Sequence, residues 1–75
     1  MRSFLEFAVK SLVDHPEEVE ISERETAEAI EVTIKVSKED LGKVIGKNGR
    51  VIKAIRTVVR NIYGSSKKRI LISVA

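Results

Sequence analysis

Two glycines, Gly46 and Gly49, interrupt a run of apolar residues that is otherwise spaced as in helices. Glycine inside a helix costs stability, because it loses more conformational freedom on folding than any other residue. We therefore predict that a short helix before Gly46 meets a longer helix after Gly49 across a tight turn. Glycine suits such a turn because it allows positive φ angles and lets another part of the backbone approach closely.

The N-terminal segment has the apolar spacing of another helix. Ser3 and Glu6 are three positions apart, as in a capping box, which predicts that the helix begins with Ser3 as its N-cap. Pro16 cannot continue a helix and disfavours helical backbone in the residue before it. The helix is therefore expected to end near Asp14.

Two segments alternate apolar and polar residues, which is typical of half-buried strands. The signal is weak at residues 19–22 and strong at residues 30–36, and a hairpin loop is expected over residues 24–28. The long helix should end at Gly64, a residue type common at helix C-termini. Residues 70–74 then predict a final strand.

A second capping signature, Ser37 to Asp40, precedes the short helix. The long helix carries a continuous apolar stripe at positions 51, 52, 55, 58, 59, 62 and 63. The predicted order is α-β-β-α-α-β, an α+β fold in one domain over residues 1–75. Three short strands form only a small sheet. We therefore expect the three helices to pack on one face of a three-stranded mixed sheet.

Charge is divided unevenly along the sequence. Residues 1–40 contain five basic and eleven acidic residues, a net charge of −6. Residues 41–75 contain nine basic residues and no acidic one, a net charge of +9, and the two halves sum to the net charge of +3. This asymmetry indicates one surface that attracts polyanions and another that repels them.

The turn between the two glycines is predicted to bind an anion. The long helix should present unpaired N–H groups and the positive end of its dipole there. Lys47 and Arg50 add positive charge, and Asn48 tolerates left-handed backbone and can hydrogen-bond phosphate oxygens. Lys53, Arg56 and Arg60 continue the positive charge along the helix, away from the apolar stripe. The residues therefore predict a phosphate-binding turn at one end of a basic helix.

Two other phosphate motifs do not fit the spacing. A P-loop needs four residues between its glycines and then Lys-Ser or Lys-Thr. Here Gly42 and Gly46 enclose three residues, and Lys47 is followed by Asn48. A dinucleotide-binding fingerprint would need a glycine at Val44 and a preceding strand.

The composition favours no enzyme and no cofactor. There is no cysteine and only one histidine, so we expect no disulfide and no transition-metal site. These counts leave a carboxylate site for a hard cation open, but we assign no metal ligand. His15 is expected to be a surface histidine at a helix end, and the acidic residues from Glu17 to Glu28 a solvated face of the hairpin. No apolar run reaches the ~18 residues of a membrane span, and no signal peptide is evident. We expect a cytoplasmic protein with no catalytic residue, membrane partner or small-molecule substrate.

The stretch from Val44 to Ile52, VIGKNGRVI, closely resembles the KH-domain signature V-I-G-x-x-G-x-x-I. The predicted element order is similar to the type II, prokaryotic arrangement of that family. The whole chain, including its opening FLEFAVKSLVDHPEEV, resembles the small bacterial single-KH proteins of the KhpA family.

This resemblance implies binding of single-stranded RNA, with about four nucleotides held by the G-x-x-G backbone and little sequence preference. Carried over onto this chain, the implied RNA-binding residues of the loop and the basic helix are Gly46, Lys47, Asn48, Gly49, Arg50, Lys53 and Arg56. The implied floor of the groove is Val44, Ile45 and Ile52, each of which could equally belong to the core.

The resemblance also implies RNA chaperoning or post-transcriptional regulation, linked to cell elongation and cell wall synthesis. Its implied partners are a second copy of the chain or a larger KH-domain protein of the KhpB (Jag) type.

Phe4 and Tyr63 lie on apolar stripes and are expected in the core, while Phe7 is free to make a contact. The short segment from Gly64 to Lys67 should leave the groove open. A protein-interaction module built on the same fold is the alternative function.

Overall fold

The computed structural model describes residues 1–64 and 68–75, and its elements follow the predicted α-β-β-α-α-β order. The helices and strands are α1 (Arg2–Leu12), β1 (Glu20–Glu25), β2 (Ala29–Lys35), α2 (Leu41–Ile45), α3 (Arg50–Tyr63) and β3 (Arg69–Val74). Three single 3-10 turns precede β1, α2 and α3, at Pro16–Glu18, Lys38–Asp40 and Lys47–Gly49. The predicted α+β fold is confirmed.

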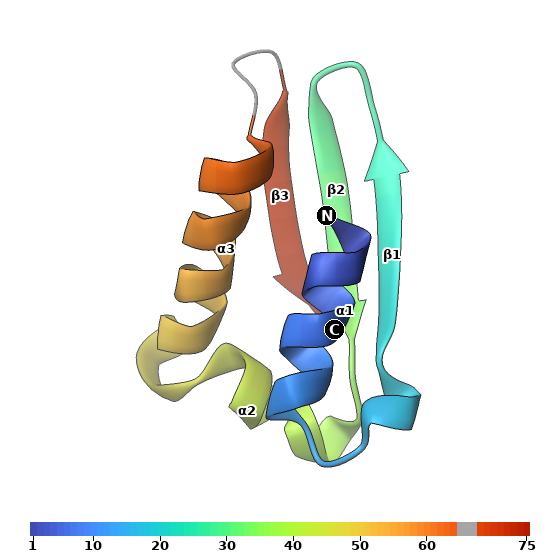
Figure 1. Ribbon diagram of the computed structural model, residues 1–75, viewed down its shortest axis with the longest axis vertical. Coiled ribbons are helices and arrows are strands. Elements are labelled where there is room, and N and C mark those ends of the chain that lie inside the picture. The colour runs from blue at the N-terminus through green and yellow to red at the C-terminus, as the bar shows by residue number, and fades with distance from the viewer. Residues whose placement is uncertain (65–67) are drawn as a thin grey trace.

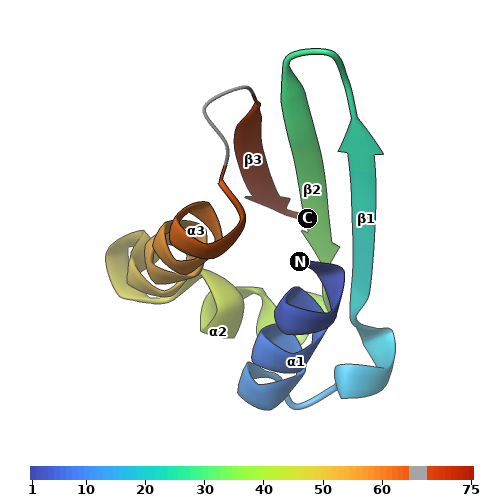
Figure 2. The same cartoon turned by 45° about the horizontal axis from the view of Figure 1, so that its top comes forward.

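The sheet has the strand order β1-β2-β3 and is mixed, as predicted. β1 pairs with β2 in antiparallel orientation, with Ile21 opposite Ile34, and β3 pairs with β2 in parallel orientation, with Ile72 opposite Val32. A parallel pair needs a long crossover connection, which α2 and α3 supply here. All three helices lie on one face of the sheet, and α3 runs beside the edge strand β3 (Figure 1, Figure 2).

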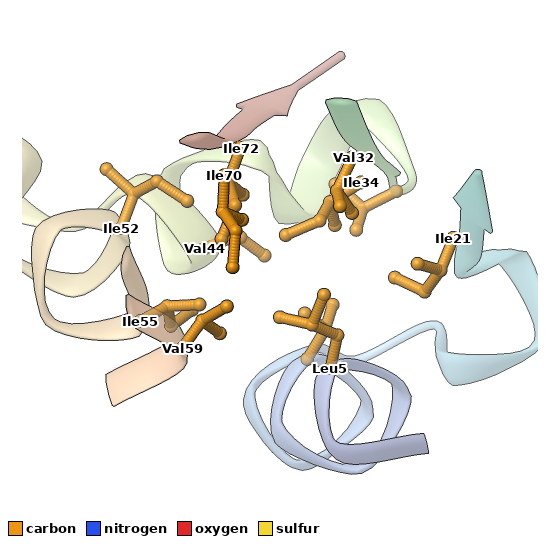
Figure 3. Packing of buried hydrophobic residues seen from close by; sticks show 12 residues of the cluster. Leu5, Ile21, Val32, Ile34, Val44, Ile52, Ile55, Val59, Ile70 and Ile72 are labelled. Carbon is orange, nitrogen blue, oxygen red and sulfur yellow. The ribbon is translucent and has the colours of Figure 1, made fainter. Parts of the chain in front are cut away.

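The core lies between the sheet and the helices, and every element described above contributes to it except the 3-10 turns (Figure 3). The strands alternate, so that their inward residues meet the apolar stripes of α1 and α3. The buried apolar cluster consists of Leu5, Val9, Ile21, Val32, Ile34, Val36, Val44, Ile52, Ile55, Val59, Ile70 and Ile72.

The predicted N-cap of the first helix is wrong. Helix α1 begins at Arg2 with Met1 as its N-cap, and no side chain caps it. Ser3 therefore lies inside the helix, whose first backbone bond runs from the Leu5 amide to the Met1 carbonyl. The Arg2 guanidinium instead donates to the Ile21 carbonyl of β1, which ties the start of the helix to the sheet.

The hairpin is tighter than the sequence predicts, because β1 continues to Glu25 rather than ending near Ser22. Strand pairing explains the extension, since Glu25 stands opposite Ile30 in the ladder. The loop contains no glycine, and the side chain of Thr26 stabilises it instead. The Thr26 hydroxyl lies 3.0 Å from the Ala29 amide and 3.1 Å from the Ala29 carbonyl, which closes the loop.

A buried carboxylate joins the end of α1 to the start of α2. Asp40, fully buried, accepts hydrogen bonds from the backbone amides of Asp14, at 3.1 Å, and His15, at 3.0 Å. Helix α1 ends at Leu12, two residues short of the predicted end, because these two amides bond to Asp40 rather than continuing the helix. The Ser37 hydroxyl accepts from the Glu39 amide, so the predicted cap exists, but it caps the 3-10 turn Lys38–Asp40. The N-cap of α2 itself is Asp40, with no side-chain cap.

The charge state of Asp40 depends on these contacts. Burial by itself would raise the pKa of the Asp40 carboxyl, but the two backbone hydrogen bonds and the nearby charges of His15 and Lys43 lower that pKa below its usual value. The hydrogen bond that the imidazole Nε2 of His15 donates to the Glu39 carboxylate, at 3.1 Å, raises the pKa of His15 against the opposing effect of desolvation. Both shifts favour the charged forms that hold this junction together.

We predict that Asp40→Asn lowers the melting temperature clearly at neutral pH. The amide keeps the shape of the carboxyl but places an NH2 group against one of the two backbone donors, which loses its acceptor. A carboxyl with a lowered pKa contributes stability above its ordinary value of 3.8, and this contribution is lost as the pH falls through the lowered value. The parent and the variant should therefore differ at pH 7 and converge in strong acid.

The measurement is a series of thermal melts by circular dichroism across this pH range. Glu28→Gln is the control, because it removes one carboxylate from an exposed hairpin position. An Asp40→Asn variant as stable at pH 7 as the Glu28→Gln variant would contradict the assigned role of Asp40.

Candidate nucleic-acid interface

The predicted turn between α2 and α3 is present and uses left-handed backbone at three positions. Gly46 has φ 77° and ψ 170°, Asn48 has φ 58°, and Gly49 has φ 73°. The Gly46 amide donates to the Gly42 carbonyl at 2.8 Å, and the Gly49 amide to the Gly46 carbonyl at 3.1 Å. Positive φ is ordinary for glycine and tolerated by asparagine, so the residue types match the backbone that they have to adopt.

The two glycines serve different purposes. A Cβ atom added to Gly46 would lie 2.4 Å from Cγ2 of Val51 and 2.8 Å from the Val51 amide nitrogen, so the close approach of α2 and α3 requires glycine there. A Cβ atom on Gly49 would meet nothing closer than 3.9 Å. At Gly49 the backbone angle alone favours glycine.

The turn exposes the N-terminus of α3. Gly49 is the N-cap, no side chain caps the helix, and no acidic residue lies in its first turn. The first backbone N–H groups of α3 therefore have no side-chain acceptor. Four exposed polar residues lie close to them in sequence: Lys47, Asn48, Arg50 and Lys53. None of the three cations forms an ion pair with a carboxylate in the part of the chain that the structure describes. Backbone donors, helix dipole and unneutralised side chains thus converge where an anion would bind.

The three apolar residues predicted for the groove floor differ in how deeply the structure buries them. Val44 is completely buried and Ile52 nearly so, and Figure 3 shows both side chains near Ile70 and Ile72. Both take the core role that the sequence left open. Ile45, directly before the turn, keeps 39% of its surface exposed, so it is the residue of the three that can offer apolar surface to a ligand.

Arg56 does not extend freely into solvent, as a basic helix face would suggest. Its side chain is half-buried and reaches from α3 to the edge strand β3. There Nε and Nη2 donate to the Ile72 carbonyl at 3.2 and 2.9 Å. The residue therefore spans the space between α3 and β3, one or two helical turns beyond the glycine turn.

A hollow of about 520 Å³ lies further along the same side of α3, where β3 begins. Its lining residues are Arg60, Gly64, Lys68, Arg69, Ile70 and Leu71. The predicted RNA-binding residues include none of these three cations, although Arg60 belongs to the predicted basic face of the helix and no carboxylate follows Asp40 in the sequence. The predicted short loop from Gly64 to Lys67 lies outside the described residues from position 65 onward.

Among the described basic residues of the second half, Lys43 and Lys68 form ion pairs away from the turn. Lys43 pairs with Asp14 beside the buried Asp40, and Lys68 pairs with Glu25 of the hairpin. These bonds connect the basic half of the chain to the acidic half. The cations of the turn and of the outer side of α3 are left to meet an external anion.

The described residues also bring possible ligand atoms of His15, Glu17 and Glu18 within 4.8 Å of one another. His15 already interacts with Glu39 through Nε2 and with Glu17 through Nδ1, so both ring nitrogens have carboxylate neighbours. Exposed acidic groups around one histidine are common without an ion, and we assign no metal site here. None of the helices in the described residues is long and apolar enough to cross a membrane.

The fold and the glycine turn together define a class. An α-β-β-α-α-β domain whose second and third helices meet across G-x-x-G, with a basic helix N-terminus and an edge strand beside it, is a KH domain of the type II arrangement. The family model described as "KhpA/KhpB, KH domain" matches residues 2–74. The chain belongs to the KhpA/KhpB KH-domain family, and the predicted family is confirmed.

Individual relatives agree with this assignment. The chain is 46% identical over 74 residues to the RNA-binding protein KhpA of Clostridium acetobutylicum, covering 99% of both chains. It is 48% identical over 66 residues to the RNA-binding protein KhpA of Listeria monocytogenes, covering 88% of this chain and 87% of that one. It also matches the solved structure "Crystal structure of APE1850" with a TM-score of 0.64 and 36% identity over 91% of its length, and spans about half (48%) of that chain.

We predict that Gly46→Ala destabilises the domain by about 1–3 kcal/mol, the usual cost of an unfavourable backbone conformation, with the clash against Val51 adding to it. Gly42→Ala is the matched control. Gly42 lies inside α2 with nothing within 4 Å of an added Cβ, so its replacement should stabilise the domain by about 0.5–1 kcal/mol. Urea unfolding of both variants measures the difference. Equal effects of the two substitutions would show that the backbone at Gly46 is not constrained.

Proposed function

We propose that the protein is a non-enzymatic RNA-binding protein that acts as one KH domain over residues 1–75. Its G-x-x-G turn binds the phosphates of a short single strand. The observation that carries this proposal is the uncapped N-terminus of α3, which stands among Lys47, Asn48 and Arg50, all exposed. KH modules hold about four nucleotides of single strand through this kind of loop. The relatives described above are named RNA-binding proteins, which supports the same conclusion.

The binding should be weak and largely sequence-tolerant. Proteins that bind single strands tightly stack bases on aromatic rings, each worth ~1–3 kcal/mol. The aromatic residues here are Phe4, Phe7 and Tyr63, on α1 and at the far end of α3 from the turn. A weak, tolerant clamp fits a chaperone or post-transcriptional regulator that contacts many transcripts in the cytoplasm. A link to cell elongation and wall synthesis is part of the same proposal and rests on family resemblance.

We predict that Lys47→Asp combined with Asn48→Asp abolishes RNA binding and leaves the fold intact. Both side chains are exposed, so stability should change within the ±0.5 kcal/mol typical of surface positions. The RNA phosphates would instead face two new carboxylates, and juxtaposed like charges cost several kcal/mol, enough to remove a micromolar interaction. The measurements are a melting curve and a titration with labelled single-stranded RNA.

The matched control is Ser3→Asp combined with Lys10→Asp, two exposed positions on α1. Each pair changes the net charge by three units, two from Lys→Asp and one from the neutral residue, so long-range charge effects are equal. The control should bind RNA nearly as the parent does. A loop variant that melts normally and binds like the control would refute the phosphate-binding turn.

Binding of RNA to the parent protein should weaken as salt is added. Three or four phosphate contacts predict that the logarithm of the association constant falls with the logarithm of the salt concentration with a slope of about −2 to −3.

Assembly is the second candidate function, and one observation favours it. Helix α3 ends in an apolar surface that the fold does not cover: Ile62 is 61% exposed, and Val58 and Tyr63 are also exposed. Tyr63 packs against Phe4 of α1, with ring centroids 6.5 Å apart. Phe4 is half-buried against the core, as expected in part, but Tyr63 is 39% exposed, so its predicted core position is wrong. Phe7, 74% exposed, adds apolar surface on α1. We propose that this surface pairs with a second copy or with a larger KH-domain protein of the KhpB type.

We predict that the parent protein dimerises at concentrations on the order of tens of micromolar and that Ile62→Lys makes it monomeric. A lysine in the last turn of a helix suits the helix dipole, so the variant should fold normally. Asn61→Lys is the matched control, since it adds the same charge at the neighbouring exposed position. Sedimentation velocity measures the three proteins. A parent that stays monomeric at these concentrations rules out the homodimer and leaves pairing with a different KH protein, which a pull-down with that protein would test.

A further inference from the structure

Among the predicted site cations, Arg56 has its side chain held by hydrogen bonds to another element of the fold. A guanidinium carries five N–H donors in a rigid plane. In Arg56, the edge formed by Nε and Nη2 converges on a single acceptor, the Ile72 carbonyl of β3, at 3.2 and 2.9 Å. This contact fixes the plane of the group across the space between α3 and the edge strand.

The contact leaves a second pair of donors directed away from the Ile72 carbonyl. One N–H of Nη1 and the remaining N–H of Nη2 point in parallel at the end of the guanidinium, a geometry that matches two adjacent acceptors. Arg56 forms no ion pair with a carboxylate among the described residues. The side chain is half-buried, so part of it can be reached from outside. The end of Arg56 is therefore a preorganised, forked donor.

The position of Arg56 favours contact with a base over contact with a phosphate. It lies seven residues after Gly49, about 10 Å along the helix axis from the turn. The turn and the exposed Arg50 and Lys53 supply the cations and N–H groups that suit a backbone. Arg56 instead lies against the edge strand β3, where the Ile72 carbonyl fixes the plane of its guanidinium, and a planar fork held in this way matches two adjacent acceptors on the edge of a base.

We propose, resting on the RNA binding proposed above, that Arg56 is a specificity-determining residue that selects at one nucleotide for a base with two adjacent acceptors. Cytosine presents such a pair at O2 and N3, and guanine at O6 and N7, the pair that arginine commonly reads in nucleic acids. Uracil and adenine alternate donors and acceptors and present none. The loop remains sequence-tolerant, and Arg56 adds a preference for cytosine or guanine at a single position.

The test uses heptamers of uridine with cytidine, guanosine or adenosine at the centre, beside the all-uridine heptamer. A short clamp can slide along such a strand, so the central base can occupy the Arg56 position. A bidentate pair discriminates by ~1–3 kcal/mol, so the cytidine or the guanosine heptamer should bind at least about fivefold more tightly than the uridine and adenosine heptamers. The comparison between cytidine and guanosine identifies which acceptor pair is read.

Protein variants and modified bases test whether the paired donors of the Arg56 guanidinium cause the preference. Arg56→Lys keeps the charge and loses the paired donors, so it should reduce the preference for the cytidine or guanosine heptamer over the all-uridine heptamer to less than about twofold. Arg60→Lys, one turn along the same helix, should keep the full preference. Replacing the central base by 3-deazacytidine or 7-deazaguanosine removes one acceptor and should remove the preference of the unchanged protein, which decides the question even if Arg56→Lys unfolds.

The outcomes separate this inference from the function on which it rests. If no heptamer binds the parent protein, the proposed RNA binding itself fails. If all four heptamers bind equally, or if the deaza bases bind like the natural ones, RNA binding stands and the role of Arg56 is overturned. A preference that survives Arg56→Lys in a folded variant also overturns it, because another group must then read the base.

Discussion

The carboxylate of Asp40 is the contact on which the placement of the site depends. It is buried and accepts from the backbone amides of Asp14 and His15, which lie in the connection that follows α1. Helix α2 starts one residue later and is only five residues long. A helix of that length has little stability of its own, so its position is set by what holds its ends. Asp40 fixes one end, and the other end is the glycine turn.

The glycine turn then transmits this placement to α3. Gly46 lets the backbone pass within van der Waals distance of Val51, so the first turn of α3 packs directly on the end of α2. Val44 and Ile52 lock the two helices into the core from either side of the turn. The N–H groups of α3 are consequently held at one place on the surface. A rigid scaffold beneath a short polar loop is the arrangement that binding sites commonly use.

Charge is used in two different ways in the two halves of the protein. Lys43 and Lys68 pair with Asp14 and Glu25 and so connect the basic half to the acidic half. The cations around the turn have no such partners among the described residues, and Arg56 is bound to a carbonyl rather than to a carboxylate. The protein therefore neutralises the cations that hold the fold and keeps the others available. The result is a positive surface along one helix of a molecule whose net charge is only +3.

The sequence by itself determined the element order and the glycine turn, because periodicity and the backbone freedom of Gly46, Asn48 and Gly49 are local properties. The sequence misjudged the start of α1, where Arg2 donates to the carbonyl of Ile21, a residue distant along the chain. It also misjudged the length of β1, whose last residue Glu25 pairs with Ile30 across the hairpin.

Only the tertiary structure decided which member of an apolar or charged pattern is buried, paired or free. It placed Val44 in the core and left Ile45 exposed, although the two are neighbours in the same motif. It turned Arg56 from one of several basic residues into a fixed bridge to Ile72, 16 positions away. It also buried Asp40, whose capping pattern had suggested a helix start and nothing more. The physical reason is the same in each case: burial and hydrogen-bond partners come from segments that the chain brings together only when it folds.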